Sequence, residues 1–302
     1  MSVRSIRPPA VWHFFFGTLG PESLCLLRAL VGAFVFVELL LMTPHVLRYV
    51  PEGSPIPFAL VDREIVNGGI TLFAWVRSVE GVMILHVIAV LMALAMAVGF
   101  MTRLSAFLTW FLYLSIANGA LYLWDGGDMV ITNVLFWLML ASLAGHAQRC
   151  YAVDEWGKGD RSRRGPVPIP AWPVRMLQIQ FCLIYFFSGW YKTQKEVWRT
   201  GEAIHYVVHQ LGLASLDLRW ISHAPAAVVV LGYAVMFLEL TFPFLVWLKP
   251  WKTFMLWSSF ALHAVIRVVL HVYSFSVMIP YLIVFVEPKT IRRFTDRHFV
   301  NR

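Results

Sequence analysis

The sequence predicts an all-α integral membrane protein, one bundle of about eight transmembrane helices with both termini in the cytoplasm. Hydrophobic residues make up 59% of the 302 residues and charged residues only 14%, and the mean hydropathy is +0.68. That is more apolar surface than a soluble core of this size needs. Apolar runs of bilayer length also recur along the chain, and basic residues gather in the segments between them.

The apolar runs define the expected crossings. They lie at residues 24–43, 79–100, 104–123, 129–146, 172–192, 225–248, 252–272 and 274–287. Each is near the ~20 residues that a helical crossing requires, except the last. The last run contains Pro280 and covers only roughly 21 Å at ~1.5 Å per residue. If this run does not cross, the C-terminal tail lies outside.

Lysine and arginine clusters predict the orientation, because cytoplasmic segments carry their excess. Such clusters occur in the N-terminal segment 1–21, the loop 147–171 and the tail 288–302, and eight crossings place all three on one side. We therefore expect a multi-pass protein of a bacterial-type cell (inner) membrane, with its transmembrane domain at 22–287. The loop resembles a solvated hinge between two four-span halves. Contact with anionic lipid explains the net charge of +8, and no nucleic-acid partner is expected.

Cysteines and histidines add little to this picture. Cys25, Cys150 and Cys182 lie far apart and form no C-x-x-C pair, so they imply neither a disulfide framework nor a thiol redox motif. In residues 202–212, apolar residues lie on one helical face and polar residues on the opposite face, the pattern of a helix lying on the membrane surface. His205 and His209 on that helix have the spacing of metal ligands, but no metal site is assigned because only Glu202 lies nearby.

The segment from Gln178 to Lys192 carries the first candidate site. A helix here puts four polar residues on one stripe: Gln178, Tyr185, Ser188 and Lys192. A polar stripe in an apolar span must face protein or water. Ser188 and Gly189 are small enough to let another helix approach beside it. Lys192 is the candidate working residue, and the alternative is that it snorkels to the lipid head groups.

A second polar stripe lies in the span 252–272, with polar residues at every fourth position: Ser259, His263, Arg267 and His271. Seven polar or ionisable residues fall in the outer half of the eight-span arrangement: Glu38, His86, Asn118, Asp125, Asp128, Lys192 and His271. Each is expensive in hydrocarbon unless paired or hydrated, so we expect a polar cavity that opens outward. Arg28 and Glu239 fall in the inner half and could satisfy each other.

Structural explanations compete with functional ones at three positions. Asp128 follows two glycines at the start of a span, where it could cap the helix N-terminus. His263 could be a hydrogen-bonding core residue and not a ligand. Lys192 can act as a base only after losing its proton, which burial and a nearby cation such as Arg267 favour and a close carboxylate opposes.

These motifs together resemble the HTTM (horizontally transferred transmembrane) domain family, over roughly residues 22–287. The matching pieces are Ser23-Leu-Cys-Leu-Leu-Arg28 with Gly32, Gly99-Phe-Met-Thr-Arg103, the segment from Asn118 to Asp128, Tyr185-Phe-Phe-Ser-Gly189 with Lys192, Trp198 and Gly201, and Phe260-Ala-Leu-His263 with Phe275-Ser276. The family includes the membrane part of vitamin K-dependent gamma-carboxylase. It is also similar to bacterial membrane proteins that help mature secreted sporulation-delaying peptides.

The resemblance implies a chemistry for Lys192. The matching lysine of the carboxylase is thought to deprotonate vitamin K hydroquinone at an active site on the lumenal face, which corresponds to the outer face here. Two positions depart from the carboxylase: Asp128 aligns approximately with a functional histidine, and Tyr191 replaces a second lysine. The sequence also has no counterpart of the lumenal domain that could hold a peptide, so the resemblance does not extend to peptide carboxylation.

Two functions are therefore expected. The first is a membrane enzyme that acts on a quinol (vitamin K-like) or another lipid-soluble substrate, with Lys192 as base and Asp128 and His263 as orienting groups. Substrate contacts are expected from Asn118, Asp125, Tyr185, Ser188, Arg267 and His271. The alternative is a non-catalytic partner for maturation, export or immunity of a small secreted peptide. That peptide, or a soluble accessory protein, would dock in the same cavity.

Overall fold

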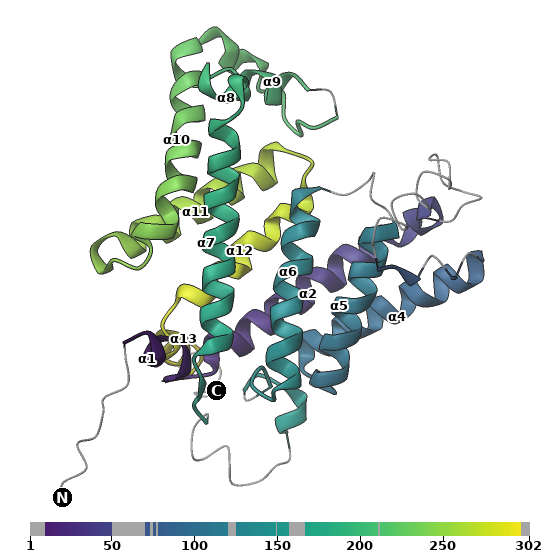
Figure 1. Cartoon of the computed structure of the whole chain (residues 1–302). Coiled ribbons are helices and arrows are strands. Elements are labelled where there is room, and N and C mark those ends of the chain that lie inside the picture. Colours follow the sequence, from purple (N-terminus) through teal and green to yellow (C-terminus); the bar gives the residue numbers. More distant parts are fainter. Residues whose placement is uncertain are drawn as a thin grey trace, which may run out of the picture. The chain divides into compact units, whose positions relative to one another are not determined.

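The computed structural model describes residues 10–49, 70–72, 75–76, 78–119, 125–148, 150–156, 167–210 and 212–296, and these residues are mostly helical (Figure 1). The long helices are α2 (Glu22–Met42), α4 (Val79–Val98), α5 (Thr102–Gly119), α6 (Gly126–Leu143), α7 (Trp172–Thr193), α10 (Pro225–Leu245) and α11 (Lys249–Val269). The short helices are α1 (Ala10–Phe16), α8 (Glu196–Arg199), α9 (Ala203–His209), α12 (Met278–Tyr281) and α13 (Pro288–Thr295). Within this described part, the only strands are β1 (Thr18–Leu19) and β2 (Ile169–Pro170), which pair antiparallel. The chain is thus nearly all-α, as the sequence predicts.

Helices occur at all eight expected positions, but they are not equally suited to cross a bilayer. Length and composition select four spans: Glu22–Val46, Val79–Val98, Gly126–Leu143 and Pro225–Leu245. A fifth is added if Tyr273–Phe285 and Pro288–Thr295, which are bent by 101°, count as one broken span. The expected crossing at 274–287 is not one regular α-helix. The 3₁₀ helices Tyr273–Val277 and Leu282–Phe285 flank α12, which contains Pro280, a residue that cannot donate a backbone hydrogen bond.

α5, α7 and α11 do not meet this test. α7 and α11 carry polar residues, yet their exposed faces are apolar. On α11 the buried residues include Ser259 and His263, whereas Phe254 and Trp257 are exposed. On α7 the exposed residues include Phe187. A soluble amphipathic helix has the reverse orientation. The arrangement is the one expected of helices whose outer faces meet lipid.

The chain divides into two compact units. Unit 1 comprises Met1–Leu123, Thr132–Gln178 and Ile283–Arg302, and unit 2 comprises Trp124–Ile131 and Ile179–Leu282. The boundaries fall just before α6, within α6, within α7 and at 282/283. The hinge loop expected at 147–171 stays a prediction. Much of that loop lies outside the described residues.

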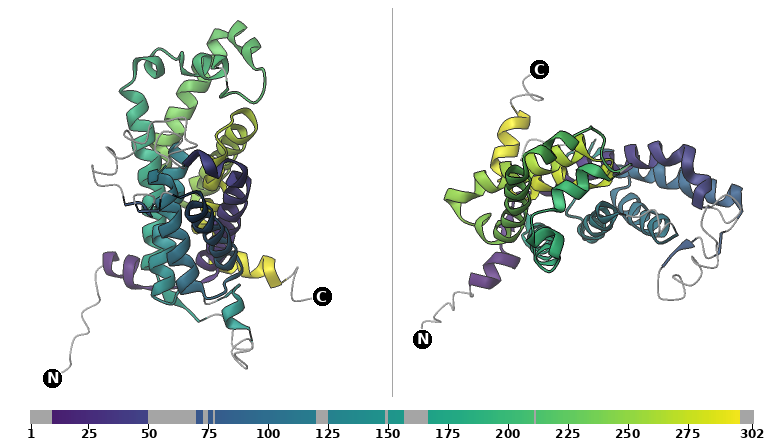
Figure 2. Two further views of the ribbon diagram at one scale, coloured as in Figure 1. Left: turned by 90° about the vertical axis from the view of Figure 1, so that its right-hand side faces the viewer. Right: turned by 90° about the horizontal axis from the view of Figure 1, so that it is seen from above.

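In unit 1, α2 packs along α4, and α4 packs on α5 (Figure 2). Gly32 lets α2 and α4 approach closely, because a Cβ there would lie only 2.7 Å from the backbone nitrogen of Ala97. In unit 2, α10 packs against α11 and against α9. α9 buries Ala203 and Val208 and exposes His205 and His209, which agrees with the amphipathic pattern of the sequence.

Candidate functional site

The predicted polar stripe of α7 faces protein along its length. Gln178 is buried and donates from Nε2 to the carbonyl of Val284 within unit 1, at 2.7 Å. Further along the helix, in unit 2, Tyr185 is buried, and Ser188 and Lys192 are half-buried. The stripe thus supplies hydrogen-bonding groups to the protein interior, because polar groups in an apolar span must avoid hydrocarbon.

Lys192 forms an ion pair with Glu239 of α10. Its Nζ lies 2.7 Å from both carboxylate oxygens, and it also donates to Ser188 Oγ at 2.7 Å. Ser188 Oγ in turn donates to Glu239 Oε1 at 3.2 Å. The side chains of Lys192 and Glu239 are 18% and 11% exposed. The ring of Trp198 lies 5.2 Å from Nζ, within cation–π range. We call Ser188, Lys192 and Glu239 the ion-pair cluster.

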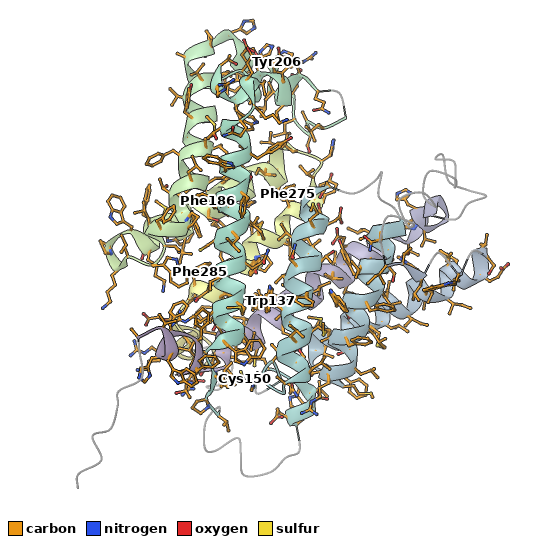
Figure 3. All side chains as sticks on the ribbon, viewed as in Figure 1. Trp137, Cys150, Phe186, Tyr206, Phe275 and Phe285 are labelled. Atoms are coloured by element: carbon orange, nitrogen blue, oxygen red, sulfur yellow. The ribbon has the colours of Figure 1, made fainter. Side chains whose placement is uncertain are left out.

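Local sequence explains how the ion-pair cluster forms. Helical side chains lean toward the N-terminus of their helix, so Lys192 reaches back over Ser188, one turn earlier. Gly189 lets α10 approach, because a Cβ at this position would lie 3.0 Å from Glu239 Cβ and 3.0 Å from Leu240 Cγ. The close approach that small residues at Ser188 and Gly189 predict is therefore confirmed. Phe186 lies nearby between α7 and α10, where it contacts Phe244 edge-on (Figure 3).

The ion pair corrects two expectations about charge. Arg28 does not pair with Glu239: it lies in unit 1, fully buried, and its guanidinium donates to the backbone carbonyls of Met96, Ala97, Ala147 and Tyr151. Lys192 does not extend toward the end of its helix, because its ammonium points back to Glu239. That carboxylate lies about 21 Å along α10 from Pro225 and about 9 Å from Leu245, at ~1.5 Å per residue.

A second buried cluster joins the two predicted stripes. Tyr185 Oη lies 2.9 Å from His263 Nε2 and also hydrogen-bonds to Ser259 Oγ. All three side chains are at most 5% exposed. His263 Nδ1 is buried and has no hydrogen-bond partner among the described residues. The hydrogen bond to Tyr185 agrees with the alternative that His263 is a core hydrogen-bonding residue.

Asp125 and Asp128 form the N-terminal cap of α6. Asp125 Oδ1 accepts from the backbone nitrogens of Gly127 at 2.6 Å and Asp128 at 3.3 Å, and Asp128 Oδ2 accepts from the nitrogen of Asp125 at 2.9 Å. This reciprocal pattern is a capping box. Ser274 also donates to Asp125 Oδ1. The capping alternative for Asp128 therefore has direct geometric support, and its catalytic role stays a prediction.

The remaining candidates lie in other surroundings. Arg267 is exposed, and its guanidinium lies 4.4 Å from the ring of Tyr273. His271 is exposed, and its Nδ1 lies 3.1 Å from the carbonyl of Gly212. Asn118 belongs to unit 1, where it donates to the carbonyl of Ile70 at 2.8 Å.

The surface helix α9 carries the two histidines with metal-ligand spacing. Their ring centroids lie 4.3 Å apart, but His205 Nδ1 is 3.0 Å from Ser222 Oγ and His209 Nδ1 donates to the His205 carbonyl at 2.8 Å. Within the described ranges, no group of three or more His, Cys, Asp or Glu side chains is arranged to hold a metal ion.

In the sequence, Glu239 stands out as an ionisable residue in a span, but nothing shows that it is the partner of Lys192. Gly189 indicates only that another helix approaches the stripe at this point. What was missing was the register of α10 along α7. Any apolar helix could have been the neighbour, and only three-dimensional packing selects the one that carries Glu239.

Comparison with known proteins agrees with this architecture. Residues 16–289, nearly the whole chain, match the HTTM domain. No curated protein and no solved structure matches the chain. The long apolar helices and this match identify the chain as a multi-pass membrane protein that belongs to the HTTM domain family.

Proposed function

We propose that this HTTM protein is a membrane enzyme whose ion-pair cluster transfers a proton to or from a hydroxyl group of a lipid-soluble substrate. One observation carries the proposal: Lys192 and Glu239 form a largely buried pair inside apolar helices, bridged by Ser188. Ionisable residues at such positions are costly and usually functional. An ion pair is not needed to hold two apolar helices together, since apolar residues of similar volume often serve stability as well or better.

The pair offers both halves of an acid–base reaction. Glu239 has carboxylate lone pairs that can accept a hydroxyl proton, and the Lys192 ammonium beside it stabilises the oxyanion that remains. The carboxylate lies 2.7 Å from Nζ and forms an ion pair with it. Lys192 therefore works together with Glu239 and does not act as an isolated base. Ser188 orients both groups, because its hydroxyl accepts a hydrogen bond from Lys192 and donates one to Glu239.

The position of the cluster favours a substrate that dissolves in the bilayer. Glu239 lies well inside α10, which meets the criteria for a membrane span. Large apolar side chains on the outer faces of α7 and α10, including Phe187, Trp190 and Phe237, are exposed. A quinol has the required hydroxyl on an apolar ring, and the ring of Trp198 beside Nζ can stack against such a ring. The resemblance to the carboxylase points to the same substrate class.

The test measures quinol-dependent oxygen uptake by the purified protein in lipid nanodiscs, with a reduced menaquinone as the probe. Lys192→Ala and Glu239→Gln should each lower the rate by about 100-fold or more, the usual contribution of a positioned acid–base group. Lys195→Ala is the matched control. Lys195 is an exposed lysine just after α7, and its Nζ lies 4.7 Å from the ring of Tyr191. Full activity of Glu239→Gln would refute the shared role of the pair.

A non-catalytic peptide partner is the alternative outcome of the same experiment. It predicts no quinol-dependent uptake by the wild type and co-purification of a small secreted peptide or soluble protein. That association should be equal for the wild type and Lys192→Ala, since docking in this case does not need the ammonium.

The membrane arrangement belongs to the same proposal. We place the chain in a bacterial-type cell membrane with eight crossings and cytoplasmic termini. Support comes from the basic segments, which eight crossings would place on one side of the membrane, and from the apolar outer faces of α7 and α11. These faces make both helices suitable for lipid despite their polar stripes.

A further inference from the structure

Two cysteines that lie far apart in sequence are neighbours in unit 1. Cys25 is fully buried on α2, and Cys150 follows α6 (Figure 3). Hydrogen bonds hold the segment after α6 over this part of α2. Cys25 Sγ lies 3.8 Å from the carbonyl of His146, and Arg28 donates to the carbonyls of Ala147 and Tyr151. Cys150 immediately precedes Tyr151, so these contacts bring its side chain to Cys25.

The two thiols lie close enough to interact with each other, and the guanidinium of Arg28 lies close enough to interact with both. We propose that Cys25 and Cys150 form a reversible disulfide in this protein. The pair is a modification site separate from the ion-pair cluster, because both cysteines belong to unit 1.

A disulfide here would fix a segment that already joins several elements. The nitrogen of Asp154 donates to the carbonyl of Gly99 at 3.0 Å, and the Asp154 carboxylate caps α5 by accepting from the nitrogens of Met101 and Thr102 at 2.8 Å each. Tyr151 Oη lies 3.2 Å from Thr295 Oγ1 at the end of α13. Oxidation would therefore join α2 covalently to the segment that carries Cys150. That segment is already hydrogen-bonded to the α4–α5 turn and to α13.

The chemistry is thiol–disulfide exchange with a low-molecular-weight disulfide. Cys150 is half-buried and reacts first: its thiolate attacks the small disulfide, forms a mixed disulfide and releases one small thiol. The Cys25 sulfur then attacks Cys150, closes the protein disulfide and releases the second thiol. The two protein thiols are oxidised and the small disulfide is reduced. The neighbouring Cys25 side chain, followed by burial, raises the pKa of the Cys150 thiol, so exchange should be slow at neutral pH and faster as pH rises.

The test treats the full purified chain in detergent with oxidised glutathione, then counts free thiols by alkylation and intact mass. Three thiols should be alkylated before treatment and only one afterwards. The remaining alkylated residue should be Cys182, and peptide mapping should recover a peptide that joins Cys25 to Cys150. Cys182 is the matched control, since it is a buried cysteine of unit 2.

Variants separate the possible outcomes. Cys182→Ser should keep the disulfide, whereas Cys25→Ser should stop at glutathione attached to Cys150. The oxidised wild type should also melt at a higher temperature than the reduced form, and a thiol reductant should reverse the shift. A wild type that keeps three alkylatable thiols after treatment with oxidised glutathione at pH 9, or that retains glutathione on Cys150, overturns the proposal. A variant is taken as folded if it elutes from size-exclusion chromatography at the same volume as the wild type.

Discussion

The contribution of the Lys192–Glu239 pair can be measured with a double-mutant cycle. The variants are Lys192→Met, Glu239→Gln and the combination of both. Each single replacement leaves one charge without its partner at a position where the side chains are only 18% and 11% exposed. The double replacement removes both charges and leaves nearly the same volume. The difference between the double variant and the sum of the singles isolates the interaction.

The magnitude follows from burial and distance. Exposed ion pairs contribute about 0.2–1 kcal/mol, whereas removal of one partner from a buried pair costs about 3–5 kcal/mol. This pair is close to the buried limit, with Nζ 2.7 Å from both oxygens. We expect a loss of about 3 kcal/mol for Lys192→Met and about 2 kcal/mol for Glu239→Gln, which keeps a hydrogen-bonding group. The double variant leaves no charge unpaired and should lose only about 2 kcal/mol, which gives a coupling of about 3 kcal/mol.

The assay is reversible unfolding in mixed detergent micelles, followed by circular dichroism. The exposed pair of Asp217 and Arg219, whose side chains are 64% and 63% exposed, is the control, and its coupling should be much smaller. The Arg219 side chain lowers the pKa of Asp217 to about 2, so this control pair stays charged throughout the usual pH range. Coupling of less than about 0.5 kcal/mol between Lys192 and Glu239 would refute the claim that the pair is buried and mutually stabilised.

Three further predictions test other parts of the structure. Gly189→Leu should separate α7 from α10 and lower both stability and activity, because even a Cβ at this position would lie 3.0 Å from atoms of α10. Gly189→Ala should have a smaller effect. Thermal unfolding measures the stability and oxygen uptake measures the activity. Arg28→Met should destabilise the protein by about 3 kcal/mol or more in chemical unfolding, since it strips hydrogen bonds from four buried carbonyls, and equal stability would contradict this role. Asp125→Ala should lose about 1 kcal/mol of stability and Asp125→Ser much less, because serine keeps a capping oxygen; equal losses would show that the cap is unimportant.

Much of the fold follows from the sequence because lipid imposes simple rules. Apolar length and the spacing of basic residues locate the helices, and the structure has a helix at each expected position. The segment 274–287 is the exception in form, since two 3₁₀ helices flank a short α-helix that contains Pro280. Helix ends and polar stripes are local properties, so a single sequence carries them.

The partners of the polar residues could be predicted only in part. The stripe containing Tyr185 and Lys192 faces protein as expected, because polar groups must avoid hydrocarbon. The choice of partner depends on which helix packs beside which, and the possible pairing of Arg28 with Glu239, suggested by depth alone, is not found. Glu239 pairs with Lys192, and Arg28 instead donates to backbone carbonyls. An arginine with five donors can be satisfied by carbonyls without any carboxylate, which spacing in the sequence does not reveal.

The cysteines illustrate the same limit. Their separation in sequence implies no disulfide framework, yet the segment that carries Cys150 folds back over α2 near Cys25. A long-range contact of this kind leaves no periodic signal in a single sequence.

The central claim is that Lys192 points into the protein and pairs with Glu239. A cryo-electron microscopy structure of the protein in lipid nanodiscs tests it most directly. We predict continuous side-chain density joining Lys192 to Glu239, with Nζ about 2.7 Å from the carboxylate and Ser188 beside both. Density that carries the Lys192 side chain outward to the lipid head groups, with Glu239 paired elsewhere, would contradict it.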